Sequence, residues 1–139
     1  MIVSNLGEYM TIFKPIEEKK VKGKVKKVFD NIKKERKIKN IPNFWKMIGN
    51  DPETLERTWT SLKEVMRKGA LDSLTKEMIY IAVSMTNSCE YCIRSHTAAA
   101  RKKGMSDKML KELIAVVGMA NETNRLVESY QVEVDDFLK

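Results

Sequence analysis

The chain has 139 residues, of which 42% are hydrophobic and 32% charged, and its formal net charge is +7 at pH 7. This length fits one domain that buries about two-thirds of the surface its unfolded form exposes, so folding alone requires no disulfide or metal. The longest apolar stretches, such as 78–83, are too short to span a bilayer, and the N-terminus lacks the features of a secretory signal. We therefore expect a cytoplasmic protein without a membrane segment.

Positive charge is concentrated at the front of the chain. Residues 1–46 contain 13 Lys and Arg against 5 Asp and Glu, whereas residues 47–139 contain 13 against 14. The lysine-rich tract 19–27 could track phosphates, but apolar residues recur through the same region at helical spacing, at Val21, Val25, Val28 and Ile32. We predict a solvated lysine face opposite a packed helical stripe, and no binding to nucleic acid at physiological salt.

No low-complexity segment, Pro/Gly-rich linker or internal repeat divides the sequence, which favours one mostly helical domain over residues 1–139. A first helix is predicted over about 16–38, between Pro15, which favours a helix start, and the break at 40–42. A short helix is predicted next, over about 42–49.

The third helix is predicted to start at Asp51-Pro52-Glu53, where a capping carboxylate precedes a proline and an acid of the first turn. It should end at Gly69, and its buried stripe should consist of Leu55, Trp59, Leu62 and Met66. The next helix, over about 75–87, leads to Cys89 and carries an apolar stripe of Met78, Ile79, Ala82 and Met85.

A further helix is predicted over 89–103, with its cysteines in the N-terminal turn. Ser106 is a suitable cap for the helix that follows, whose inward side chains should be Met109, Leu110, Leu113, Ile114 and Val117. A last, separate helix should begin near Asn121 and run through Leu126 and Tyr130, while Val132 and Val134 alternate as in a strand.

The most reactive part of the chain is the run from Cys89 to His96, Cys-Glu-Tyr-Cys-Ile-Arg-Ser-His, which holds both cysteines and the only histidine. In a helix, Cys89, Cys92 and His96 share one face. The helix N-terminus stabilises a thiolate there, and His96 can take the proton of Cys92. A thiol oxidised by peroxide to a sulfenic acid can then be resolved by the second thiol. Glu77, on the preceding helix, could exchange protons with this cluster.

Other interpretations of these residues stay open. The two cysteines could be small buried hydrophobic side chains, or Cys89, Cys92, His96 and Glu77 could be four zinc ligands. Structural zinc sites usually draw their second ligand pair from a distant segment, which argues against the latter. Glu77 alone could be a helix-start acid favoured by the helix dipole. We favour thiol redox chemistry.

The stretch from Glu77 to His96, followed by Gly104, resembles the alkylhydroperoxidase D-like branch of the carboxymuconolactone decarboxylase family. Its signature is a Glu followed by Asn-x-Cys-x-x-Cys-x-x-x-His, and the resemblance covers about 73–117, with weaker similarity at 42–45 and 124–125. It implies an all-α fold, a single-domain helical bundle of about six to seven helices. It also implies small subunits that assemble into dimers, trimers or hexamers.

The same resemblance implies a peroxidase that reduces organic or hydrogen peroxides and is re-reduced by a dithiol donor of thioredoxin or lipoyl type. Cys92 would attack the peroxide, next to its base His96, Cys89 would resolve the product, and Glu77 would complete a proton relay. No haem, flavin or metal is needed in that chemistry. Well-studied peroxidases of the family carry a histidine where this chain has Tyr91, so a relay here would be shorter or slower.

Two alternative functions remain. One is the lactone decarboxylation that gives the family its name, which does not depend on a cysteine pair. The other is a non-enzymatic helical oligomer, either zinc-stabilised or purely structural.

Overall fold

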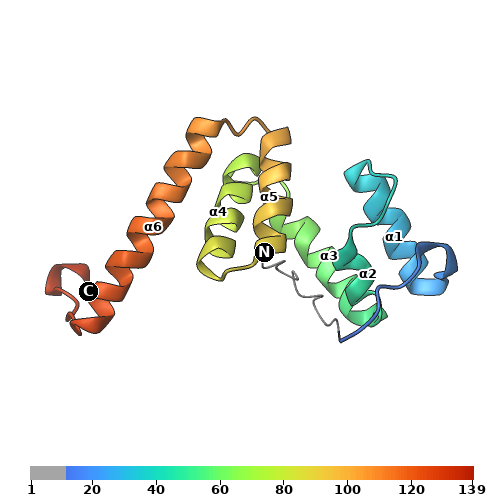
Figure 1. The fold of residues 1–139 in the computed structure, drawn as a ribbon, viewed down its shortest axis with the longest axis horizontal. Coiled ribbons are helices and arrows are strands. Elements are labelled where there is room, and N and C mark those ends of the chain that lie inside the picture. Colours follow the sequence, from blue (N-terminus) through green and yellow to red (C-terminus); the bar gives the residue numbers. More distant parts are fainter. Residues whose placement is uncertain (1–11) are drawn as a thin grey trace, which may run out of the picture. The chain divides into compact units, whose positions relative to one another are not determined.

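The computed structural model describes residues 12–139 of the chain (Figure 1). Within that range it contains six α-helices, two short 3-10 turns and no β-strand, which confirms the predicted all-α fold class. The described residues form two compact units, and the chain passes from the first to the second between Val65 and Met66. The prediction of one domain over residues 1–139 stays a prediction. None of the described helices is both long and apolar enough to cross a membrane.

The first unit contains the 3-10 turn η1 (Glu18–Lys20) and helices α1 (Gly23–Arg36), α2 (Asn43–Ile48) and α3 (Pro52–Met66). The helix predicted over 16–38 is therefore too long at its start. Lys22 is extended and Gly23 has a φ of +57°, a conformation that glycine adopts without steric cost. This backbone break separates the turn η1 from α1.

Apolar side chains of the three helices and of the connection before α2 form the core of the first unit: Val28, Phe29, Ile32, Ile41, Trp45, Leu55 and Trp59. The rings of Trp45 and Trp59 meet edge to face, with centroids 5.3 Å apart, a geometry worth about 0.5–1.5 kcal/mol beyond burial. The Arg36 guanidinium lies 5.4 Å and 5.3 Å from the two ring centroids. Most lysines of 19–27 are exposed opposite this core, as the sequence predicts.

One carboxylate, that of Glu18, joins three parts of the first unit. It accepts a hydrogen bond from the Ile41 backbone N–H at 2.7 Å and pairs with Lys33 of α1 at 2.6 Å and Lys46 of α2 at 3.3 Å. Its side chain is 19% exposed. Burial raises the pKa of Glu18, but the bonds from Lys33, Ile41 and Lys46 outweigh burial, so the pKa lies below its ordinary value.

The second unit contains α4 (Ser73–Thr86), α5 (Glu90–Lys102), α6 (Asp107–Ser129) and the 3-10 turn η2 (Asp136–Leu138). Helices α4 and α5 lie side by side as an antiparallel pair (Figure 1). The Asp72 carboxylate caps α4 by accepting the N–H groups of Leu74 and Thr75, each at 2.9 Å. The Ser106 hydroxyl caps α6 through the Met109 N–H, as predicted.

The core of the second unit consists of Ile81, Ala100 and Met105, with Leu74, Met78, Met85, Met109, Leu110 and Leu113 packed against them. Two residues predicted to pack inward do not: Ile79 and Ile114 are each 49% exposed. In α4 the fully buried position is Ile81 instead. The apolar residues of α4 therefore lie on more than one side of the helix.

Helix α6 runs without interruption through Asn121, so the prediction of a separate last helix starting there is wrong. The Asn121 side-chain amide donates to the Val117 carbonyl at 2.8 Å and to the Thr86 hydroxyl of α4 at 3.0 Å. The amide thus supports the helix instead of capping a new one. Residues 132–134 do not form the strand suggested by their alternation.

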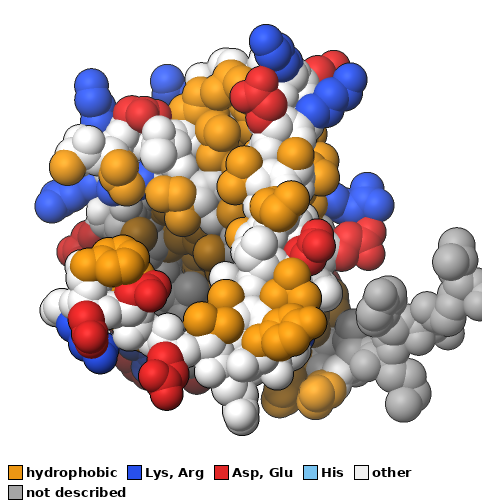
Figure 2. All heavy atoms as spheres, turned by 90° about the vertical axis from the view of Figure 1, so that its left-hand side faces the viewer, with side chains coloured by type: hydrophobic (Ala, Val, Ile, Leu, Met, Phe, Trp, Pro, Cys, Tyr) orange, Lys and Arg blue, Asp and Glu red, His pale blue; other side chains and the backbone are white. Residues whose placement is uncertain are grey.

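Helix α6 has no fully buried residue, although many of its side chains are apolar. One side of α6 faces the rest of the second unit. On it, Leu110 and Leu113 pack against the core, and Asn121 bonds to Thr86 of α4. The opposite side carries a second apolar stripe, whose residues are all exposed: Val116, Met119, Leu126, Val127 and Tyr130. Figure 2 shows hydrophobic side chains spread over the face viewed from the α6 side. We call these five residues the α6 stripe.

Replacing Glu18 by Gln should lower the free energy of unfolding at pH 7 by about 1–3 kcal/mol, because two lysines and a backbone N–H lose a charged acceptor. The contribution of Glu18 is complete above its ordinary pKa of 4.5 and is lost as the pH falls through the lowered pKa of the folded state. The difference between the two proteins in urea unfolding should therefore shrink below pH 4.5. Glu17→Gln, which removes a pair with exposed Lys20, is the matched control and should change little. Equal losses in both variants would contradict this account.

Candidate functional site

The connection between α4 and α5 places both cysteines at the N-terminal end of α5. Helix α4 is capped at Asn87, and Ser88 reverses the chain with a φ of +55°. The Cys89 N–H then donates to the Ser84 carbonyl of α4 at 2.9 Å, and Cys89 is the N-cap of α5. The prediction that the cysteines occupy the N-terminal turn of this helix is confirmed.

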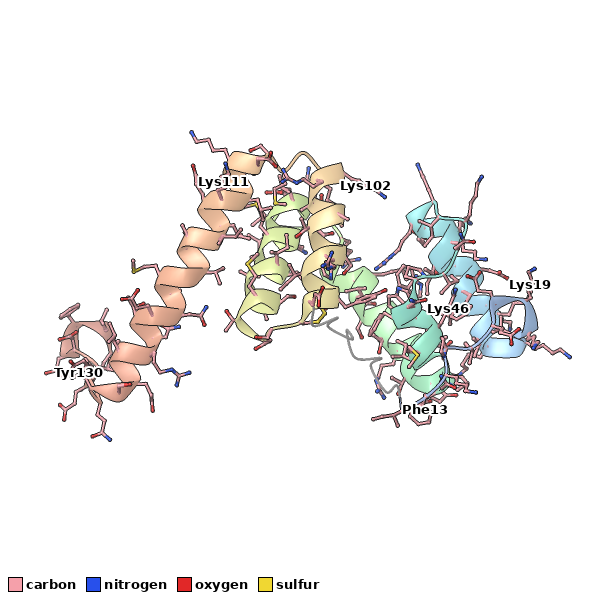
Figure 3. The ribbon with its side chains drawn as sticks, viewed as in Figure 1. Phe13, Lys19, Lys46, Lys102, Lys111 and Tyr130 are labelled. Carbon is pink, nitrogen blue, oxygen red and sulfur yellow. A yellow bond between two sulfur atoms is a disulfide. The ribbon has the colours of Figure 1, made fainter. Side chains whose placement is uncertain are left out.

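Cys89 and Cys92 are joined by a disulfide bond, with their Cα atoms 5.3 Å apart (Figure 3). The Cys92 backbone N–H also donates to the Cys89 sulfur at 3.3 Å. Both residues are partly exposed, so a small molecule or a second thiol can approach them. A single turn of helix thus holds the two Cα atoms at a separation within the range usual for disulfides.

His96 lies one turn beyond Cys92 on α5 and is held by two contacts from α4. Its Nδ1 is 2.6 Å from Glu77 Oε2, and its ring stacks on that of Tyr80, with centroids 3.6 Å apart and an angle of 19° between planes. The carboxylate and the stacked ring fix the imidazole's orientation. With Nδ1 engaged by Glu77, Nε2 is the nitrogen left for proton transfer.

Glu77 is buried, with 6% of its side chain exposed, and both carboxylate oxygens are engaged. Oε2 meets His96, and Oε1 lies 2.6 Å from the Lys103 ammonium. Burial raises the pKa of Glu77, but the hydrogen bonds and charges of His96 and Lys103 outweigh it and hold the pKa below its ordinary value. Glu77 is therefore an ionised group inside the second unit.

Sequence reasoning named Cys89, Cys92, His96 and Glu77, and the structure brings them to the facing sides of α4 and α5. It missed Tyr80 and Lys103. Tyr80 follows Glu77 by one turn, so helical spacing could have placed it next to the same face. Lys103 is 26 residues from Glu77, and only the antiparallel packing of the two helices makes them neighbours. Tyr91, the position that departs from the family pattern, is 46% exposed.

Among residues 12–139, no group of three or more His, Cys, Asp or Glu side chains is arranged to hold a metal ion. The four residues considered as zinc ligands bond to one another and to Lys103. The two cysteine sulfurs form the disulfide, and the Glu77 carboxylate oxygens contact His96 Nδ1 and Lys103 Nζ. The arrangement combines a reducible disulfide with a carboxylate-oriented imidazole, which suits electron and proton transfer.

The model of the carboxymuconolactone decarboxylase family matches residues 52–132 of this chain. Among solved structures, the alkylhydroperoxidase AhpD core from Rhodospirillum rubrum is 51% identical in sequence and superimposes with a TM-score of 0.79. That match covers 84% of this chain and 87% of the other.

Two curated relatives match over shorter parts of their length. An uncharacterised protein encoded in the cox locus of Paracoccus denitrificans is 39% identical over 54 residues, which are 39% of this chain and 49% of the relative. An alkyl hydroperoxide reductase of Mycobacterium tuberculosis is 22% identical over 117 residues, 84% of this chain and 33% of the relative. The chain thus spans half or less of the length of these curated relatives. The family match and the sequence identity to a solved structure along most of its length lead to one conclusion: this chain belongs to the carboxymuconolactone decarboxylase family, in its alkylhydroperoxidase D-like branch.

Proposed function

We propose that this protein is a thiol-dependent peroxidase that reduces organic or hydrogen peroxides through Cys89 and Cys92. The observation that carries the proposal is the disulfide at the N-terminal turn of α5, on the same helix as a carboxylate-oriented His96. Similarity to an alkylhydroperoxidase core and to an alkyl hydroperoxide reductase supports it. Lactone decarboxylation, the family's other chemistry, leaves the cysteine pair without a use.

The chemistry balances with a dithiol as the reductant. The Cys92 thiolate attacks one peroxide oxygen, so that an S–O bond forms and the O–O bond breaks, and the leaving alkoxide or hydroxide takes a proton. Cys89 then attacks the sulfur of the sulfenic acid, forming the disulfide and releasing water. Two electrons pass from the pair to the peroxide. A dithiol donor of thioredoxin or lipoyl type returns two electrons and two protons.

His96 is the proposed proton carrier. Its Nε2 takes the proton of the Cys92 thiol and delivers it to the leaving oxygen, while Glu77 holds Nδ1. We assign the attack to Cys92 because it is one helical turn from His96. One contact favours the opposite assignment: the Cys89 sulfur accepts the Cys92 N–H, which also stabilises a thiolate. Variants of the two cysteines separate these assignments.

The partly exposed position of the pair supports access by a donor thiol. Because the disulfide must be reduced after each turnover, we also propose that the protein works in the cytoplasm, where dithiol reductants keep such pairs reduced. The chemistry itself requires no haem, flavin or metal.

We further propose that the protein functions as a homo-oligomer, joined through the α6 stripe. All five residues of the stripe are exposed, although α6 is 23 residues long and has no buried position. Their positions place them on one side of α6, as is suited to pairing with an identical helix. A second copy would cover apolar side chains that one chain leaves in water.

Reduced protein mixed with one equivalent of an organic hydroperoxide should lose two thiols. Cys92→Ser should abolish the reaction, because the attacking sulfur is absent. Cys89→Ser should still react but stop at a sulfenic acid, which a dione probe and mass spectrometry detect. Ser95→Ala, which removes a hydroxyl that donates to the Cys92 carbonyl, is the control and should react normally.

The reverse pattern in the two cysteine variants would exchange their roles without removing the peroxidase proposal. Thiols that are indifferent to hydroperoxide in the unsubstituted protein would refute it. Purified protein with one bound zinc per chain would refute it as well.

Met119→Asp combined with Val127→Asp should convert the oligomer to a monomer of about 16.1 kDa. The charges at these two positions of the stripe oppose its burial against a second copy. Both side chains are exposed in the single chain, so the helicity should be retained. Sedimentation velocity gives the mass of each species. Asn124→Asp, which adds one negative charge to the same helix outside the stripe, should leave the oligomer intact. A monomeric unsubstituted protein would contradict the proposal.

A further inference from the structure

The buried Glu77 carboxylate is bracketed by two nitrogen atoms from one helix. His96 Nδ1 lies 2.6 Å from Oε2, and Lys103 Nζ lies 2.6 Å from Oε1. We propose that Lys103 is a positioning residue of this site, whose ammonium keeps Glu77 ionised and aimed at His96 in both protonation states of the imidazole. The role within catalysis rests on the proposed peroxidase function.

The need for such a residue follows from burial. An ionised carboxylate with 6% of its side chain exposed requires a compensating charge. If His96 were its only partner, the compensating charge would be the imidazole's own proton, which a proton carrier must give away. Lys103 supplies a fixed positive charge instead. His96 can then accept a proton from Cys92 and release it to the leaving oxygen while Glu77 stays charged.

Among the charged groups around Glu77, Lys103 is the one that supplies a permanent positive charge to the carboxylate. From α5, the charges that act on this carboxylate are those of Lys103 and His96, and both lower its pKa. On α4, Tyr80 stacks on His96, and the Lys76 ammonium donates to the Arg67 carbonyl at 2.7 Å. Helix α6 bonds to α4 at Thr86, the other end of that helix.

The position of Lys103 explains how it reaches Glu77. It is the C-cap of α5, with 33% of its side chain exposed. Because α4 and α5 are antiparallel, the end of α5 lies beside the first half of α4, where Glu77 is located. A lysine at this point could also serve only to clamp the two helices, so the test must separate a charge effect from a loss of stability.

His96 is the only histidine of the chain, so its Cε1–H proton gives one imidazole signal in an NMR titration. The experiment uses the disulfide form, in which neither cysteine titrates. Lys103→Met should move the midpoint of the His96 titration to higher pH by about one unit, because the removed charge opposed a proton on the imidazole. Lys103→Arg should restore the original midpoint.

Two further variants sharpen this result. Lys103→Gln keeps a hydrogen-bond donor for Glu77 without the charge, and it should shift the midpoint as Lys103→Met does. Lys102→Met makes the same change in net charge one residue away, where the side chain points outward from α5 (Figure 3), and it should leave the midpoint unchanged. A midpoint that stays constant in Lys103→Met and Lys103→Gln, while the melting temperature falls, would overturn the proposal in favour of a clamp.

Peroxide consumption by the same proteins separates this inference from the function it rests on. The shifted midpoint should reduce the rate at pH 7 in Lys103→Met, because less of the imidazole is free to accept a proton, with recovery at higher pH and in Lys103→Arg. A shifted midpoint in a protein that never consumes peroxide would refute the peroxidase function and leave the electrostatic role of Lys103 standing. If the protein consumes peroxide, but Lys103→Met changes neither the His96 midpoint nor the pH dependence of the rate, the inference is refuted and the proposed function stands.

Discussion

The second unit depends on one buried negative charge, that of Glu77. Its two oxygens bind a histidine and a lysine from the facing helix, so a single carboxylate links α4 to α5 at two levels. Because the charge would be costly if either partner were removed, it fixes the relative register of the helices more tightly than apolar packing alone. The same bonds orient the imidazole. Helix pairing and site geometry therefore have a common origin.

The other end of the helix pair is set by backbone geometry. The Cys89 N–H on the Ser84 carbonyl and the reversal at Ser88 bring the start of α5 back along the end of α4. The sulfurs consequently lie at a helix N-terminus, where backbone N–H groups favour a thiolate. Glu77 thus holds the imidazole, and the Ser84 carbonyl holds the start of the cysteine pair, on one hairpin of α4 and α5.

Local signals in the sequence predicted most of this architecture. Asp51 and Ser106 are strong caps, and the starts of the helices that they begin were predicted correctly because capping depends on neighbouring residues only. The start of α1 at Gly23 and the continuity of α6 through Asn121 were not predicted. A polar residue or glycine within a helical pattern is compatible both with a continuous helix and with a break.

For the candidate site, too, the sequence predicted what depends on neighbouring residues and missed what depends on packing between helices. The cysteines and His96 share one helix, so spacing alone placed them together. Their separate roles in catalysis, and that of Glu77, stay predictions. The contact of Lys103 with Glu77 depends on packing between helices, and a lysine near a helix end is usually a solvated residue with no special meaning. No periodicity marks it in the sequence.

The distribution of aromatic and imidazole groups gives each unit its own reporter. Both tryptophans of the chain, Trp45 and Trp59, belong to the core of the first unit, whereas the only histidine lies in the second. Indole fluorescence therefore follows the unfolding of one unit and the imidazole NMR signal that of the other, without any added label. Coincident transitions in denaturant would mean one cooperative body, and separate transitions two.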